Sequence, residues 1–404
     1  MLIIINLPLW GQRYIERWSN CVGRTLLAEG NLPSLAKSDD VELQIVTTLD
    51  DVDFLESLPI IEVMRQMCRV KVREMKKPKT VYEGMTVANV LTLRDAIEGK
   101  SKYLLTLGDQ IWADGSLVNI LKKLEQSHSV LSWSGILDRQ SVIPQLVNFH
   151  RGLVIEIPPS RLAELAIRFP HPAQRNCMVE QGFVPRTPSS MIWVDPQASC
   201  TVIRSHILVM HGIDFAKIDT EKALRYVAKL SRGRVNDDVA LYEYLFDDVG
   251  QITVVQNSEE VITVSLDDNR RSNVNTSRIT VDQSKVKEDT LNSLRNHQPW
   301  EPRLGRYFFS IPYVMSVRLD KEWARQTINE TFDISVRASI LHQKRFSLGS
   351  VWVRLSHRQK TRILWLFESL GLLRHISKKL IGYELRDKKR KPHEHSESVG
   401  TEES

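Results

Sequence analysis

The sequence predicts an α/β fold in which a mostly parallel sheet is flanked by helices, followed by a mainly helical C-terminal extension. Apolar runs of strand length, such as residues 2–7 and 41–47, alternate along the chain with segments whose apolar residues recur at helical spacing. This alternation is typical of parallel strands joined by right-handed crossovers. With 404 residues, 42% of them hydrophobic, the chain can form two or three domains, or one large domain with an appendage.

The composition argues against several classes of protein. No apolar run reaches the ~18 residues that a membrane-spanning helix needs, and the start of the chain lacks the basic region of a signal peptide. Four scattered cysteines show neither zinc-ligand spacing nor a disulfide pattern, which favours a reducing cytoplasm: Cys21, Cys68, Cys177 and Cys200. The net charge of +6 is mild, and no readout motif accompanies the basic residues, so nucleic-acid binding is not predicted.

The first two strands end in turns of different chemistry. Residues 2–7 lead into Pro8 and a helix with an aromatic face, whereas residues 41–47 lead into Asp50 and Asp51. In a nucleotide-binding sheet, Asp50 could hold ribose hydroxyls or a base edge. The alternative is that Asp50 or Asp51 caps the helix that follows.

The stretch YLLTLGDQIWADGS, residues 103–116, carries the first candidate site. Its apolar run stops at Asp109, and helical spacing of apolar residues resumes at Leu117. Because ligands bind outside the carboxyl ends of parallel strands, Asp109 is expected to stand in that crevice. A carboxylate there can ligate a divalent cation, Mn²⁺ or Mg²⁺, which in turn binds nucleotide phosphates. The alternative is a turn residue that caps the next helix.

Strands and helices continue to alternate through the middle of the chain. We expect strands at residues 68–73, 129–134, 190–194 and 200–204, an extended segment at 145–157, and helices at 85–97, 164–169 and 224–230. Residues 182–190 are rich in proline and polar side chains, so a loop is expected there.

An acidic pair, Asp237 and Asp238, carries the second candidate site. It opens a helical segment with Leu241 and Leu245 on one face, and Gly250 precedes the next apolar run. A cap with a first-turn acid, favoured by the helix dipole, is one interpretation. A general base at the start of the helix is the other.

This order of features resembles the GT-A class of sugar-nucleotide glycosyltransferases, particularly the large inverting, family-2-like group. The resemblance covers roughly residues 1–265. It rests on the acidic pair and on the glycine and strand that follow it. Two features ahead of the pair also match, namely an apolar strand that ends in Arg204 and a Gly-Ile-Asp turn at 212–214. One departure is visible. Asp109-Gln-Ile is not the Asp-x-Asp motif of that family, and Asp114 lies five positions further on.

The resemblance implies a role for each matched residue. Asp109 corresponds to the metal-binding acid of the Asp-x-Asp motif, and we expect it to contact the nucleotide-sugar donor together with Asp50 and Arg204. Asp238 corresponds to the catalytic base, with Asp237 as the first acid of the pair. A cation at Asp109 would neutralise the leaving diphosphate, while Asp238 would deprotonate the acceptor hydroxyl. Direct in-line attack would invert the anomeric carbon.

The chain is expected to divide into four parts. Residues 1–265 form the GT-A-like catalytic domain, 266–299 a polar connecting segment, 300–385 a C-terminal extension, and 386–404 a charged, disordered tail. Between residues 354 and 391, an apolar stripe with Trp365 is interleaved with basic residues. This basic amphipathic helix either packs on the core or lies on an anionic membrane surface.

These inferences together predict a cytoplasmic glycosyltransferase, with a peripheral position at the inner face of a membrane as one possibility. It would move a sugar from a nucleotide-sugar donor to a hydroxyl of a glycan or lipid-linked acceptor in polysaccharide synthesis. The alternative from another class is a non-catalytic GT-A-like nucleotide-binding or scaffolding protein, which the departure from Asp-x-Asp suggests.

Overall fold

The computed structural model describes most of the first 268 residues and parts of the chain after them. The described residues are 1–179, 183–185, 190–195, 197, 199–205, 208–231, 245–246, 248–268, 278–280, 311–317 and 323–329. The chain divides into two compact units, Met1–Ser339 and Ile340–Ser404. All described residues belong to the first unit, so the predicted basic helix and tail lie outside them.

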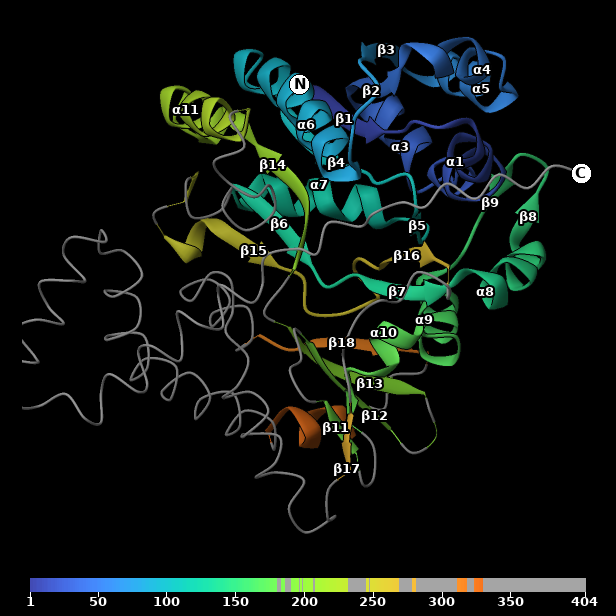
Figure 1. Ribbon diagram of the computed structural model, residues 1–404. Coiled ribbons are helices and arrows are strands. Elements are labelled where there is room, and N and C mark those ends of the chain that lie inside the picture. Colours follow the sequence, from blue (N-terminus) through green and yellow to red (C-terminus); the bar gives the residue numbers. More distant parts are fainter. Residues whose placement is uncertain are drawn as a thin grey trace, which may run out of the picture. The chain divides into compact units, whose positions relative to one another are not determined.

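A seven-stranded sheet forms the centre of the first unit (Figure 1). Its order is β15 (Ile252–Val254), β6 (Ser129–Ser132), β14 (Val209–Asp214), β4 (Lys102–Leu105), β1 (Leu2–Pro8), β2 (Asp40–Thr48) and β3 (Arg69–Met75). Only β14 runs antiparallel to its two neighbours, and every other pairing in this sheet is parallel. The predicted mostly parallel sheet is confirmed.

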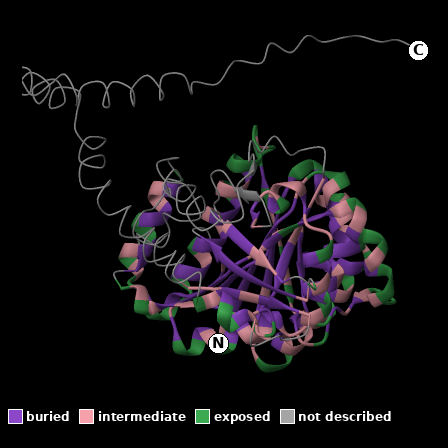
Figure 2. Cartoon of the chain, turned by 90° about the horizontal axis from the view of Figure 1, so that it is seen from below, coloured by how far each residue is buried: buried purple, intermediate pink, exposed green. Residues whose placement is uncertain are grey.

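Helices cover both faces of this sheet. The Tyr103 hydroxyl of β4 lies 3.3 Å from Thr92 Oγ1 on α6 (Val81–Glu98). On the next residue of the strand, Leu104 faces the other way, toward Gly212 and the apolar side of α7 (Ser116–Gln126). With helices on both faces, the strands in the middle of the sheet, β1, β4 and β6, are buried (Figure 2), whereas the edge strand β3 is mostly half-buried or exposed. Burial on both faces explains why β1 and β4 are near-continuous apolar runs in the sequence.

Two smaller sheets, one of three strands and one of four, extend the unit, in addition to two two-stranded pairs. One has the order β5 (Gln110–Trp112), β16 (Thr263–Asp267) and β7 (Gly135–Asp138), and the other has the order β10 (Met178–Val179), β12 (Ser190–Val194), β13 (Cys200–Ser205) and β18 (Tyr313–Ser316). Strand β16 therefore runs across residue 265, where the catalytic domain was expected to end. Strand β18 brings a segment of the predicted C-terminal extension against β13.

The other described elements are mostly short. They are α1 (Gln12–Arg17), the π-helix η1 (Trp18–Val22), α2 (Gly23–Leu26), α3 (Leu32–Ser38), η2 (Leu49–Asp51), α4 (Val52–Glu56), α5 (Pro59–Met67), α8 (Arg139–Leu146), η3 (Val147–Phe149), β8 (His150–Arg151), β9 (Val154–Ile155), α9 (Pro159–Arg168), α10 (Pro172–Arg175), β11 (Phe183–Pro185), η4 (Phe215–Lys217), α11 (Thr220–Leu230), η5 (Val249–Gln251) and β17 (Arg278–Thr280). In this part of the chain, no helix is both long enough and apolar enough to cross a bilayer.

Two local predictions were wrong. Residues 145–157 were expected to be extended, but helix α8 continues to Leu146 and a 3₁₀ turn follows before the short β8–β9 hairpin. Asp138 starts this helix, since its carboxylate accepts a hydrogen bond from the Ser141 backbone N–H at 3.3 Å. Residues 182–190 were expected to form a loop, yet β11 pairs with β17, a partner almost a hundred residues away. Local composition carries no signal for such a partner.

His211 is fully buried where β14 has a bulge. The register of β14 against β6 shifts between Met210 and Gly212. The imidazole packs at a steep angle against the Trp112 ring, with centroids 5.4 Å apart, and its Nε2 lies 2.6 Å from Ser132 Oγ. Burial lowers the pKa of His211 to about 3, because the charged imidazolium would lose its hydration.

We expect His211 to make the protein less stable in mild acid. Its pKa is 6.5 as an ordinary group and about 3 in the fold, so the unfolded chain binds more protons between these values. The free energy of unfolding therefore falls as the pH falls through that window, by roughly 1 kcal/mol at pH 5.5. Urea unfolding at pH 7.5 and 5.5 measures the loss of unfolding free energy between the two pH values. In His211→Gln this loss should be smaller by roughly 1 kcal/mol. An equal loss in both proteins would show that His211 does not contribute.

Candidate active site

The carboxyl ends of β1, β2 and β4 lie side by side at one edge of the sheet. The turn after β1 is fixed to the turn after β2 through Asp51, whose carboxylate accepts hydrogen bonds from the Gly11 backbone N–H at 2.7 Å and from Thr48 Oγ1 at 2.5 Å. Gly11 has a φ of 84°, a value that favours glycine. Asp51 is thus buried in a structural role, and the neighbouring Asp50 is exposed.

Asp109 lies in the turn between β4 and β5. Its backbone carbonyl accepts a hydrogen bond from the Leu266 N–H at 2.8 Å, which holds the turn against β16. Beside it, a Cβ on Gly108 would come within 2.8 Å of the Tyr14 ring, so a glycine is needed for the ring to pack here. The next helix, α7, starts behind Gly115 without a side-chain cap. Asp109 is therefore not the cap of that helix.

The three-stranded sheet brings further charged residues to Asp109. Strands β7 and β16 are parallel with Asp138 opposite Asp267, so the residues that follow, Arg139 and Asp268, leave the sheet at the same edge. Strand β5 pairs with the other side of β16, which sets Asp109 beside this edge. Residues that are more than a hundred positions apart in the sequence are therefore neighbours in space.

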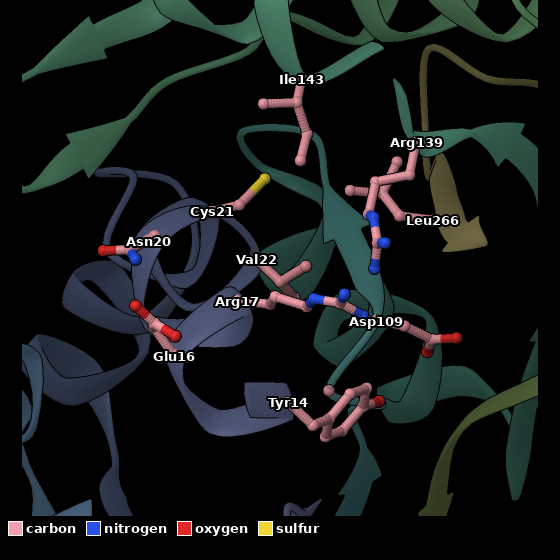
Figure 3. A pocket seen from close by; sticks show the side chains of 11 residues that line it. Tyr14, Glu16, Arg17, Asn20, Cys21, Val22, Asp109, Arg139, Ile143 and Leu266 are labelled. Atoms are coloured by element: carbon pink, nitrogen blue, oxygen red, sulfur yellow. The ribbon is translucent and has the colours of Figure 1, made fainter. Parts of the chain in front are cut away.

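A pocket of about 320 Å³ opens at this place (Figure 3). Helix α1 and the π-helix form one wall, and the turn after β4, the start of α8 and the end of β16 form the others. The lining residues are Tyr14, Glu16, Arg17, Asn20, Cys21, Val22, Gly108, Asp109, Arg139, Ile143 and Leu266. The guanidinium groups of Arg17 and Arg139 point toward each other in this view.

The two arginines meet on one carboxylate. Arg139 Nη2 donates to Asp268 Oδ1, and Arg17 Nη1 lies 3.7 Å from Asp268 Oδ2. The three side chains are partly buried, with 18%, 31% and 22% of the surfaces of Arg139, Arg17 and Asp268 exposed. At this depth water screens their charges less than on an open surface.

The surroundings change the acidity of the groups that line the pocket. Removal from water, with a smaller contribution from the negative charge of Asp267, raises the pKa of Asp109 to about 6. Burial and the charge of Asp109 raise the pKa of Tyr14 well above its ordinary range. Burial also raises the pKa of the Cys21 thiol to about 12, so this thiol is not an activated nucleophile. Asp109 is the group of this pocket that titrates close to neutral pH.

The described residues do not fit a preformed cation site. Two carboxylates, Asp109 and Glu16, line the pocket, and Asp268 is already paired with two guanidinium groups. Within the described ranges, no group of three or more His, Cys, Asp or Glu side chains is arranged to hold a metal ion. Cation binding at Asp109 stays a prediction.

The predicted site residues fall in different places. Asp50 is exposed on η2, and Arg204 is fully buried on β13, where its Nη2 donates to the Ile328 carbonyl at 3.2 Å. Neither lines the pocket that contains Asp109. Asp237 and Asp238 lie outside the described residues. The donor contacts of Asp50 and Arg204, and the catalytic roles of the acidic pair, therefore stay predictions.

Sequence reasoning missed four residues at the pocket. Tyr14 and Arg17 fall in the helix with an aromatic face that was expected after residues 2–7, Arg139 was not singled out, and Asp268 was placed in a polar connecting segment. A signal was present for Asp268 alone, because an apolar run, residues 261–266, stops at Asp267 and Asp268 just as the earlier run stops at Asp109.

Comparison with known proteins finds distant structural neighbours. No protein-family model matches the chain, and no curated protein matches it. The crystal structure of residues 1–349 of S. aureus TarS in complex with UDP aligns at 13% identity and a TM-score of 0.32, over 90% of this chain and 78% of that one. Another S. aureus TarS structure aligns at 21% identity and a TM-score of 0.22, over 34% of this chain and 22% of that one.

A second kind of neighbour is named as a synthase. The 4-diphosphocytidyl-2C-methyl-D-erythritol synthase of Anaerococcus prevotii aligns at 14% identity and a TM-score of 0.33, over 72% of this chain and 95% of that one. At identities and TM-scores this low, the neighbours do not assign an activity. A function must be argued from the residues of this chain.

Proposed function

We propose that the chain is a glycosyltransferase that moves a sugar from a nucleotide-sugar donor to an acceptor hydroxyl in glycan or polysaccharide synthesis. The observation that supports it is the pocket at the carboxyl edge of the parallel sheet, whose lining includes Asp109 and two arginines, Arg17 and Arg139. Ligands of such sheets bind at this edge. Displacement of a nucleoside diphosphate from a sugar requires stabilisation of the charge that develops on the leaving phosphates.

The proposed reaction divides the work between two places. The nucleotide lies along the turns after β1 and β2, near Asp50, and its diphosphate lies toward Asp109. Asp238 takes the proton of the acceptor hydroxyl as that oxygen attacks the anomeric carbon, and the diphosphate leaves from the opposite side. This direct displacement inverts the anomeric configuration. The roles of Asp238 and Asp237 rest on the sequence resemblance.

A thermal-shift panel of nucleoside diphosphates and sugar nucleotides, with and without Mn²⁺, tests the proposal. A ligand that binds only the folded state raises the melting temperature, by mass action. We expect one nucleotide to stabilise the protein and its sugar nucleotide to be consumed when acceptors are added. Stabilisation without consumption of any donor would favour the second candidate, a nucleotide-binding or scaffolding protein. The missing second acid after Asp109 is the feature that favours that candidate.

A separate prediction concerns an anionic membrane surface as partner. If the basic amphipathic segment after Arg354 binds anionic lipid, deleting residues 355–404 should release the protein from vesicles that contain phosphatidylserine. Added salt should also weaken binding of the intact chain. Co-sedimentation with anionic and neutral vesicles measures both effects. A truncated protein that aggregates would indicate instead that the apolar stripe packs on the core.

A further inference from the structure

We propose that Arg17 and Arg139 together bind the diphosphate of the ligand directly, and that Asp268 is the carboxylate that pairs with them while the pocket is empty. This inference deepens the proposed function, on which the identity of the ligand as a nucleotide donor rests. It assigns the neutralisation of the diphosphate to two side chains that come from separate parts of the chain, α1 and the start of α8.

The geometry of the two arginines is suited to this task. Both line the same pocket, and both contact the same carboxylate, one through each of its oxygens. Because they contact the two oxygens of one carboxylate, the two guanidinium groups lie close enough together for the adjoining phosphoryl groups of one diphosphate to contact both. Arginine presents a planar fork of donors that matches phosphate oxygens in pairs.

The charges explain why the exchange with Asp268 favours a diphosphate. Asp268 offers one negative charge and two oxygens to two cationic groups. A diphosphate offers two or more negative charges and more acceptor oxygens, so it can bind both forks at once. Asp268 directly follows β16 and is itself partly exposed, so its carboxylate can turn to water when it is displaced.

The local structure holds both arginines in place before the ligand arrives. Arg139 is the first residue of α8, whose start is fixed by the hydrogen bond from Ser141 to Asp138. Arg17 ends α1, and the next residue, Trp18, is fully buried. Backbone positions that are fixed in this way reduce the entropy lost on binding.

The test measures dissociation constants of inorganic pyrophosphate and of UDP, GDP, ADP and CDP by calorimetry in EDTA. We expect the wild type to bind pyrophosphate and at least one of the nucleotides without a cation. Arg17→Gln and Arg139→Gln should each weaken this binding about tenfold, the scale of one charge-assisted pair. The dissociation constant of Arg139→Lys should lie between those of the wild type and Arg139→Gln, since lysine keeps the positive charge but lacks the planar pair of donors. The matched control is Arg161→Gln, which breaks the Arg161–Glu164 pair on α9 and should change nothing.

Asp268→Asn is the most informative variant, because it is expected to strengthen pyrophosphate binding whereas the arginine variants weaken it. Removal of the competing carboxylate should tighten pyrophosphate binding several-fold. If the Arg–Asp pairs only support the fold, the same variant should melt earlier and bind no tighter, which would overturn the inference. Unchanged dissociation constants in the arginine variants, or no binding by the folded wild type in EDTA, would overturn it as well.

These outcomes separate the inference from the proposed function. Pyrophosphate binding that depends on Arg17 and Arg139, in a protein that transfers sugar from no donor, would retain the inference and contradict the proposed function. Sugar transfer that is unaffected in both arginine variants would support the proposed function and contradict the inference.

Discussion

Asp109→Asn is expected to raise the stability of the ligand-free protein. The fold raises the pKa of this carboxyl from 3.8 to about 6, chiefly by removing it from water. The native state therefore binds more protons than the unfolded chain between these two values, and the free energy of unfolding falls as the pH rises through the same window. Above it the ionised carboxylate costs about 1–3 kcal/mol, after allowance for its partial exposure. Asparagine does not ionise, so the cost disappears.

Denaturant unfolding at pH 4 and pH 8 measures the effect. The wild type should lose stability relative to Asp109→Asn as the pH rises, and the variant should melt several degrees higher at pH 8. Asp114→Asn, on the turn between β5 and α7, is the matched control. Its Oδ1 accepts a hydrogen bond from the Gly30 N–H at 2.7 Å, so this variant should lose about 1 kcal/mol instead. A destabilised Asp109→Asn would mean that the carboxylate supports the fold.

The same variant tests the cation predicted from the sequence. If Asp109 is a ligand for Mn²⁺ or Mg²⁺, any increase in nucleotide affinity that the cation produces should vanish in Asp109→Asn, since a neutral amide is a weaker ligand for a hard cation. Binding in EDTA should persist if the two arginines carry it. A residue that lowers stability and supports binding fits the usual conflict between stability and function.

The central sheet could be predicted from the sequence because its signals are local. Strands covered on both faces must be apolar along their whole length, so residues 2–7 and 41–47 stand out without any knowledge of their partners. The position of Asp109 at the end of such a run could be predicted for the same reason. The role of Asp51, on the turn after β2, could not be predicted from the sequence. Only its contacts with Gly11 and Thr48 show that it is structural.

The rest of the pocket depends on pairings that a local pattern does not contain. Arg139 and Asp268 meet because β7 and β16 are parallel with a particular register. A shift of one residue in this register would place a different residue opposite Arg139, so the pair would not form. Arg17 joins them from α1, for which the sequence shows an apolar face but no binding partner. Asp267, whose negative charge acts on Asp109, likewise comes from the end of β16 and not from the positions next to Asp109 in the sequence.

The acidic pair was predicted from its order in the sequence, and its mutation tests the proposed function. We expect Asp238→Asn to lower turnover by ~10²-fold or more, the usual scale for loss of a positioned general base, with donor binding near normal. The reason is that an amide cannot accept the proton of the attacking hydroxyl. Asp237→Asn should cost less. Transfer rate, donor dissociation constant and melting temperature are measured on each variant.

A helix cap at the same position would give a different pattern. Loss of a cap costs ~1 kcal/mol of stability and leaves the chemistry of a folded enzyme largely intact. The two roles are therefore separated by comparing rate with melting temperature on one protein sample. If Asp238→Asn melts early and still transfers sugar at the native rate, the acidic pair only starts a helix, and the base must be sought elsewhere. Asp109, whose pKa of about 6 suits a proton acceptor near neutral pH, would then be the first residue to test.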